Sequence, residues 1–182
     1  MTIPKRDISC IALWLIPFFV FLCIDMAEAR AATNVSGVIA SSTTWTLDQS
    51  PYVVEGSGGA NFFVVDSGAT LTIEPGVVVK FASAGQLIVR GELDAEGSDE
   101  NPIVFTSLTD DSVAGDTNGD GSNSLPGPGW WWHIAFESGS IGTTTHSIIR
   151  YAGGTAPFCS PDCSGAGIFN KGGDMVIQHS LI

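Results

Sequence analysis

Short β-prone runs repeat along most of this chain, and no stretch after residue 33 shows helical periodicity. Each run is rich in Val, Ile, Phe, Tyr or Thr, and clusters of Gly, Asp, Asn, Ser and Pro separate the runs. This pattern predicts an all-β chain with many short strands. The predicted strands are residues 52–54, 62–65, 70–73, 77–81, 86–90, 103–106, 133–136, 147–151, 167–169 and 175–178.

The connections between the runs favour a coiled parallel solenoid over an antiparallel sandwich or barrel. Antiparallel neighbours need tight hairpin turns such as Asn-Gly, but the one Asn-Gly pair, Asn118-Gly119, lies inside a long polar segment. The other connections are Gly-rich and typical of corners, since Gly bends the chain at low conformational cost. Predicted corners include 66–68, 74–76 and 91–94. Strand centres recur at roughly 15–20 residues or simple fractions of that interval.

Several segments resemble the early coils of bacterial right-handed parallel β-helix proteins of the pectin-lyase-like superfamily. The segments are residues 68–81, 87–97, 101–107, 130–136 and 147–152. The resemblance covers about residues 35–182 and implies an all-β, right-handed parallel β-helix. It does not imply one activity, because this superfamily includes lyases, glycoside hydrolases, adhesins and inert surface proteins.

The N-terminal segment has the composition of a secretory signal peptide. Lys5 and Arg6 precede an apolar run over residues 8–24, and an Ala-x-Ala site ends at Ala29. We expect residues 1–29 to be a signal peptide and the chain to be secreted or displayed at the cell surface. The alternative is an uncleaved membrane anchor, although Pro17 interrupts the run.

The rest of the chain is then interpreted as one solenoid. Residues 30–52 are expected to form the N-terminal cap and first coil, and residues 53–182 the further coils, with an acidic insertion at 108–129. The apolar strand at the C-terminus lacks a polar cap, which predicts an N-terminal fragment of a longer protein. Cys159 and Cys163 are predicted to form a small disulfide loop, since an exported chain favours disulfides and a metal site would need further Cys or His ligands nearby, which are absent from the sequence there.

The acidic insertion contains half of a calcium-loop pattern. Asp116, Asn118 and Asp120 occupy alternate positions and Gly121 is sixth, as in the first half of an EF-hand loop. The twelfth position is Gly127 instead of Glu, so this is not an EF-hand. We expect structural calcium here, with further carboxylates from Asp110 or Asp111. The alternative is a solvated polar loop in which these residues only form turns.

Three consecutive tryptophans follow the insertion. Trp130, Trp131 and Trp132 cannot all face the interior of a strand, because the pleat alternates faces. One interpretation is a platform on which a sugar ring stacks. The other, which we favour, is packing beneath the inserted loop.

Charge and composition exclude several partners. The chain has 7 basic and 19 acidic residues, a formal net charge of −12, which argues against nucleic acid and against an anionic lipid surface. No catalytic residues are predicted, because the three histidines are isolated in sequence and the basic residues are scattered. Asp94 and Glu96, which would share a face of an extended strand, are expected in a turn.

These observations predict an exported structural or adhesive surface protein that displays loops for glycans or other surfaces, with membrane contact only through the N-terminal segment. The alternative is the leading part of a polysaccharide lyase or glycoside hydrolase whose catalytic coils lie beyond residue 182.

Overall fold

The strands form three parallel sheets, and each coil of the chain contributes one strand to each sheet. The structure is a computed structural model that describes residues 31–55, 61–154 and 165–182. In these ranges regular structure is almost entirely β, and the one helical element is a single 3-10 turn, η1 (Leu47–Gln49).

The sheets take every third strand in chain order. Sheet 1 contains β1 (Thr33–Val35), β4 (Tyr52–Val54), β7 (Val78–Phe81), β10 (Ile103–Ser107) and β13 (Ser147–Ile149). Sheet 2 contains β2 (Gly37–Ile39), β5 (Phe62–Val65), β8 (Gln86–Val89), β11 (Ile134–Phe136) and β14 (Ile168–Asn170). Sheet 3 contains β3 (Thr43–Trp45), β6 (Thr70–Ile73), β9 (Glu92–Glu96), β12 (Ile141–Thr145) and β15 (Asp174–Gln178).

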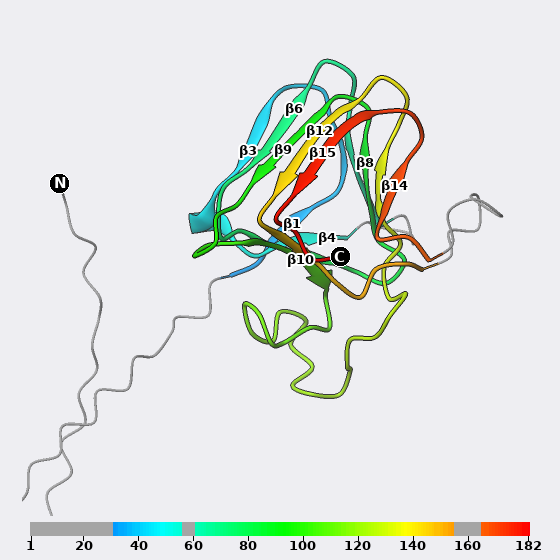
Figure 1. Cartoon of the computed structure of the whole chain (residues 1–182). Helices are drawn as coiled ribbons and strands as arrows, with labels where there is room; N and C mark the ends of the chain where they lie inside the picture. Colours follow the sequence, from blue (N-terminus) through cyan, green and yellow to red (C-terminus); the bar gives the residue numbers. More distant parts are fainter. Residues whose placement is uncertain (1–30, 56–60, 155–164) are drawn as a thin grey trace, which may run out of the picture.

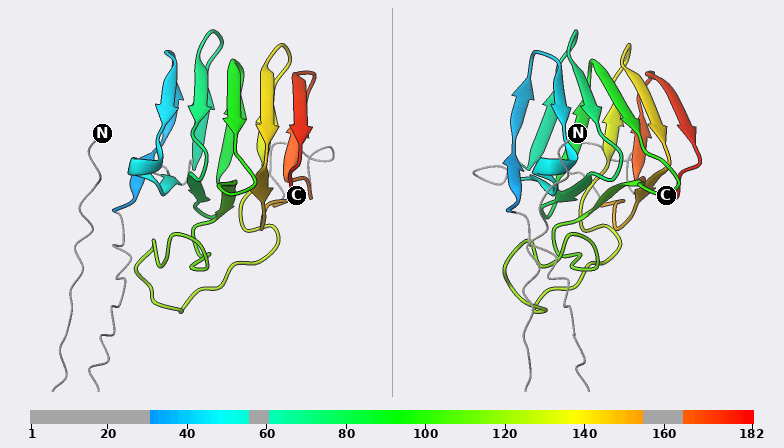
Figure 2. Two further views of the ribbon diagram at one scale, coloured as in Figure 1. Left: turned by 60° about the vertical axis from the view of Figure 1, so that its left-hand side comes forward. Right: turned by 90° about the vertical axis from the view of Figure 1, so that its left-hand side faces the viewer.

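This topology is a parallel β-helix. The chain passes through sheets 1, 2 and 3 in turn and then returns to sheet 1, one strand further along (Figure 1). Figure 2 shows the five coils side by side, with the long insertion projecting beyond the sheets. All the strand pairs are parallel, so each coil stacks on the next at about 4.8 Å. The all-β solenoid expected from the sequence is therefore confirmed.

All ten predicted strands are present, with boundaries that shift by no more than two residues. The sequence prediction missed β1, β2, β3, β9 and β12. The predicted corner at 91–94 was wrong, because only Gly91 turns and β9 begins at Glu92. Asp94 and Glu96 therefore lie on a strand and share its outer face, since Leu93 and Ala95 between them are buried.

The coils have unequal lengths, which hides the repeat in the sequence. Successive register pairs in sheet 1 are Thr33 with Tyr52, Tyr52 with Val79, Val78 with Val104, and Ile103 with Ser147. Only the first pair, Thr33 with Tyr52, is separated along the chain by a number of residues within the expected 15–20. The extra length lies mainly in connections between sheets 1 and 2, where the insertion over residues 108–133 links β10 to β11.

Inward-facing side chains form continuous apolar ladders between the sheets. One ladder stacks Leu71, Leu93 and the backbone of Gly142, and a neighbouring one contains Val65, Val89 and Phe136. Gly142 is required there, because a Cβ at this position would collide with the Phe136 ring. Aromatic stacking links the first coil to the second. The rings of Trp45 and Tyr52 are nearly parallel, and their centroids lie 4.7 Å apart.

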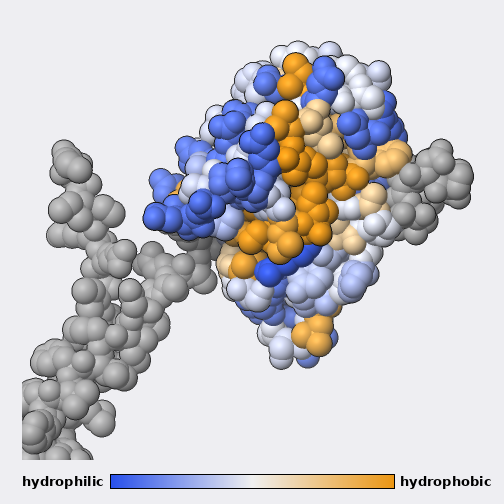
Figure 3. Space-filling view, in the orientation of Figure 1, coloured by the Kyte–Doolittle hydropathy of each residue, from blue (hydrophilic) through white to orange (hydrophobic). Residues whose placement is uncertain are grey.

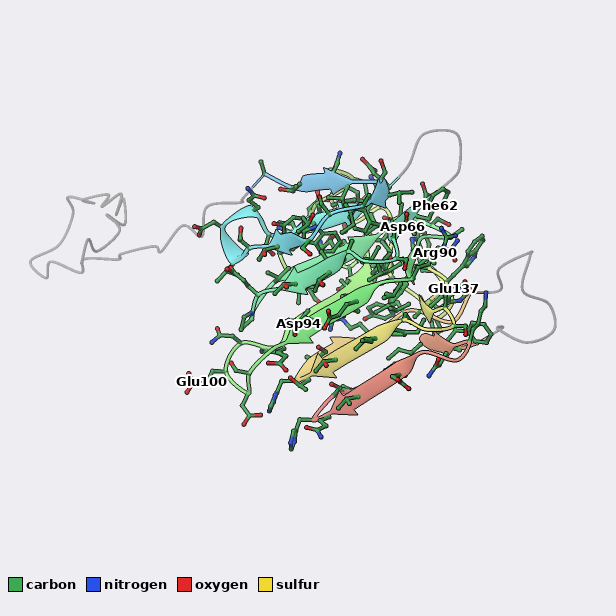
Figure 4. All side chains as sticks on the ribbon, turned by 90° about the horizontal axis from the view of Figure 1, so that it is seen from above. Phe62, Asp66, Arg90, Asp94, Glu100 and Glu137 are labelled. Atoms are coloured by element: carbon green, nitrogen blue, oxygen red, sulfur yellow. The ribbon has the colours of Figure 1, made fainter. Side chains whose placement is uncertain are left out.

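A ladder of alternating charge follows the corner between sheets 2 and 3. Asp66, Arg90 and Glu137 come directly after β5, β8 and β11 and follow one another along the coils (Figure 4), and Lys171 continues the series after β14. The Lys171 ammonium lies 3.2 Å from a Glu137 carboxylate oxygen. Alternation avoids the repulsion that like charges would produce at the short distance between coils.

The strands of the first coil, and β14 and β15 of the fifth, pair on one side only, whereas β13 also forms a parallel bridge from Ile148 to Leu181. Apolar side chains gather on the face of the molecule seen in Figure 3, which includes the fifth coil. Val176, Ile177, Leu181 and Ile182 are among the exposed apolar residues.

In the described ranges, no helix has the length and apolarity needed to cross a bilayer. The expected signal peptide and the Cys159–Cys163 pair lie outside the described residues.

Candidate metal centre

The insertion over residues 108–133 folds against the outer face of sheet 1. Lys80 on β7 and Thr106 on β10 point outward by strand alternation, yet both are fully buried because the insertion covers them. The chain returns to the solenoid at Trp130, whose backbone N–H donates to the Tyr151 carbonyl and whose carbonyl accepts from the Ala84 N–H. The insertion is therefore a folded part of the structure with its own anchor residues.

The Asp116 carboxylate organises the tip of the insertion. One of its oxygens accepts hydrogen bonds from the backbone N–H groups of Gly119 and Asp120, at 2.8 and 3.2 Å. The other accepts from the Gly121 N–H at 2.8 Å. Gly121 has a φ of +72°, a conformation that favours glycine, so the sixth position of the sequence pattern turns the chain as expected.

Three carboxylates converge at this turn. One oxygen each from Asp111, Asp116 and Asp120 lies within 4.8 Å of the others. The Oδ1 atoms of Asp111 and Asp120 are shielded from solvent and have no hydrogen-bond partner among the described contacts. Buried carboxylate oxygens without partners are costly unless a cation or a donor reaches them. This oxygen-only set has the chemistry of a site for a hard divalent cation.

The other two predicted ligands have different roles. The Asp110 carboxylate is buried and lies 2.5 Å from the Arg150 guanidinium, and it also accepts from the hydroxyls of Thr106 and Ser112. Burial raises the pKa of Asp110, but the hydrogen bonds from Ser112 and Thr106 and the Arg150 charge outweigh it, so the net pKa is lowered. The Asn118 amide donates to Asp120 Oδ2 and to the Ser124 hydroxyl.

Lys80 is a buried cation of this region that the sequence did not single out. Its ammonium donates to the Gly115 carbonyl at 2.7 Å and to the Thr117 hydroxyl at 2.6 Å. Burial lowers the pKa of Lys80, although the charges of Asp110, Asp111 and Asp116 partly oppose this. Lys80 therefore connects the loop to β7. In the sequence, only its position on the outward-facing side of a predicted strand pointed to this contact.

The three tryptophans separate into different environments. Trp131 is fully buried, stacks on Phe81 at 4.1 Å between ring centroids, and donates from Nε1 to the Arg150 carbonyl. Both faces of its ring are thus unavailable to a sugar. Trp130 and Trp132 are partly exposed, so they are the members of the trio that remain candidates for stacking.

His133 is buried on the outer side of sheet 2, next to Phe169. Burial, and secondarily the Lys171 charge, lowers the pKa of His133 below its ordinary 6.5. The folded state therefore favours the neutral imidazole. The contribution of His133 to the free energy of unfolding is present in full above the unfolded pKa and is lost as the pH drops through the folded pKa. We expect a steeper loss of unfolding free energy between about pH 7.5 and pH 5 in the wild type than in His133→Phe. Urea unfolding across this range measures it, and parallel curves would contradict it.

The structure also brings together two histidines that lie far apart in the chain. The rings of His146 and His179 stack with centroids 4.8 Å apart and an interplanar angle of 13°. The sequence contains a repeated segment, His-Ser-aliphatic-Ile, at residues 146–149 and 179–182. The coil register is needed to see that these two segments occupy equivalent positions.

The geometry defines the class of this protein as a parallel β-helix with a folded acidic insertion. No protein-family model, curated protein or solved structure matches this chain.

Proposed function

We propose that this protein is a structural β-helix scaffold whose largest loop is organised by calcium. The observation that carries the proposal is the convergence of Asp111, Asp116 and Asp120 with two carboxylate oxygens that lack partners. Calcium takes six to eight oxygen ligands in flexible geometry, so backbone carbonyls and water complete such a set. Asp110 is already neutralised by Arg150, which leaves the three converging carboxylates to the ion.

The wider role in this proposal is the display of loops to glycans or other surfaces outside the cytoplasm. The partly exposed Trp130 and Trp132 beside the insertion support this role. The fold is compatible with a right-handed, pectin-lyase-like solenoid, and that assignment belongs to the proposal. Lys80 is committed to the loop by two short hydrogen bonds, which favours a structural role over proton abstraction.

Calcium titration by calorimetry tests the loop directly. The wild-type protein is expected to bind one calcium ion per chain and to gain thermal stability, because an ion that binds only the folded state stabilises it. Asp111→Asn combined with Asp120→Asn is expected to remove the heat and the stabilisation, since the amides keep the shape but lose the charge.

The matched control is Asp94→Asn combined with Asp174→Asn. This pair makes the same change in net charge on the outer face of sheet 3, away from the loop, and is expected to bind calcium like the wild type. Equal, negligible heats for the wild type and the loop variant would refute the calcium proposal. A control variant that loses binding as well would show only a general charge effect and would also refute it.

A further inference from the structure

A second cluster of side chains of metal-ligand type lies at the corner between sheets 3 and 1, outside the insertion. His146 follows β12 directly and precedes β13, and His179 follows β15 directly. Thr145 pairs with Gln178 in register, so the two histidines occupy equivalent positions on adjacent coils. The His146 N–H donates to the Gln178 carbonyl, and the Ser147 N–H donates to the Ser180 hydroxyl, which fixes this alignment.

Both histidines have the left-handed backbone conformation, with φ of +45° and +50°. This conformation is uncommon for residues other than glycine and costs roughly 1 kcal/mol or more. The same one-residue turn in both coils directs the two side chains the same way, which is why the rings stack. The equivalent backbone conformation of the two corners therefore places the two imidazoles next to each other.

An acidic and polar rim surrounds the pair. His146 Nε2 lies 3.3 Å from an oxygen of Asp99, whose side chain is almost fully exposed. The three residues line a shallow cavity of about 350 Å³. The rest of its wall is formed by Ser98, Pro102, Ser147, Ile148, Ser180 and Leu181.

We propose that His146, His179 and Asp99 bind a divalent transition metal ion of the zinc type. Two imidazoles and one carboxylate, with water in the fourth position, are a ligand set that Zn²⁺ accepts in tetrahedral geometry. This inference is independent of the calcium proposal, because imidazole nitrogen suits zinc and copper whereas calcium prefers oxygen.

Coordination requires the side chains to move, since within the described ranges only Asp111, Asp116 and Asp120 already place three ligand atoms within 4.8 Å of one another. Parallel stacked rings direct their lone pairs side by side, and tetrahedral zinc brings its ligand nitrogens to about 3.3 Å from one another. Rotation of the partly buried His146 ring and the exposed His179 ring about their side-chain torsions supplies this approach while the backbone corners stay in place. The exposed Asp99 carboxylate is free of burial constraints and follows the ion.

The experiment is a Zn²⁺ titration of protein carrying Asp111→Asn and Asp120→Asn, so that the acidic loop does not contribute. Calorimetry is expected to show one zinc per chain, with no heat from Ca²⁺. In NMR spectra, the ring signals of His146 and His179 are expected to shift together, while those of His133 remain unchanged. The NMR result requires no substitution at the histidines themselves.

His146→Asn and His179→Asn are the informative variants, since asparagine tolerates the left-handed conformation. Each is expected to weaken zinc binding at least about tenfold, and Asp99→Asn to weaken it less. Glu100→Gln is the control and should bind like the parent, since Glu100, labelled in Figure 4, directly follows Asp99 in the sequence. Zinc binding that survives the double histidine variant, or ring signals that do not respond to zinc, would overturn the proposal.

Discussion

Replacement of Trp131 with alanine is expected to lower the free energy of unfolding by about 3–5 kcal/mol. The ring is fully buried against Phe81, and its removal leaves a cavity that the surrounding strands cannot close. The variant also loses the hydrogen bond from Nε1 to the Arg150 carbonyl. Because natural domains are stable by only about 5–15 kcal/mol, this loss is a large fraction of the total. Urea denaturation monitored by circular dichroism measures it.

Trp132→Ala is the matched control, since it removes the same side chain from the neighbouring, partly exposed position. Its unfolding free energy is expected to fall much less. If both variants lost the same stability, Trp131 would not be the anchor of the returning chain. Limited proteolysis of the insertion adds a second readout, and the Trp131 variant is expected to be cleaved faster within residues 108–129.

Gly91→Ala is expected to destabilise the protein by about 3 kcal/mol, at the upper end of the range for overpacking. A Cβ at Gly91 would collide with the backbone carbonyl oxygens of Ala69 and Asp66, which belong to the preceding coil. No side-chain rotation relieves this clash, because both obstacles are main-chain atoms. Moving the backbone would disturb the hydrogen bonds from Gly91 N–H to Val65 and from Ile141 N–H to Gly91. Thermal unfolding of the purified variant tests the expectation.

Gly127→Ala provides the comparison for this prediction. A Cβ there has no heavy atom within 4 Å, and the backbone is not in the left-handed region. Its stability is expected to stay within about 0.5 kcal/mol of the wild type, as for most surface substitutions. A Gly91 variant as stable as the Gly127 variant would mean that adjacent coils approach less closely than described here.

The fold was predictable because the apolar strands carry their own signal. β5 and β6 match their predicted limits, since Val, Phe, Leu and Ile are concentrated in them and Gly-rich corners follow. β9 and β12 were missed because Glu, Asp, Thr and Gly dominate them. Their strand conformation comes from pairing with neighbouring coils on both sides, which is a tertiary effect that local propensity does not contain.

The candidate site was only partly predictable for a related reason. The alternate spacing of Asp116 and Asp120 identified the turn, because local hydrogen bonds within one loop determine its shape. The sequence did not distinguish Asp110 from Asp111, since their roles depend on Arg150 from the following coil. Lys80 and the His146–His179 pair were missed because coil register, and not sequence proximity, brings their partners together.

The position of the insertion has a practical consequence for engineering. β10 pairs in register with β7, and β11 pairs in register with β8. Residues 108–133 connect β10 to β11, whereas only residues 82–85 connect β7 to β8. The coil thus tolerates a long excursion at this corner, and the entropy of closing a longer loop grows only slowly with length. A foreign epitope is accordingly better grafted within the resident loop, at the exposed Leu125, than at residues 82–85, where the Ala84 N–H and the Gly85 carbonyl hold the returning chain at Trp130 and Trp132.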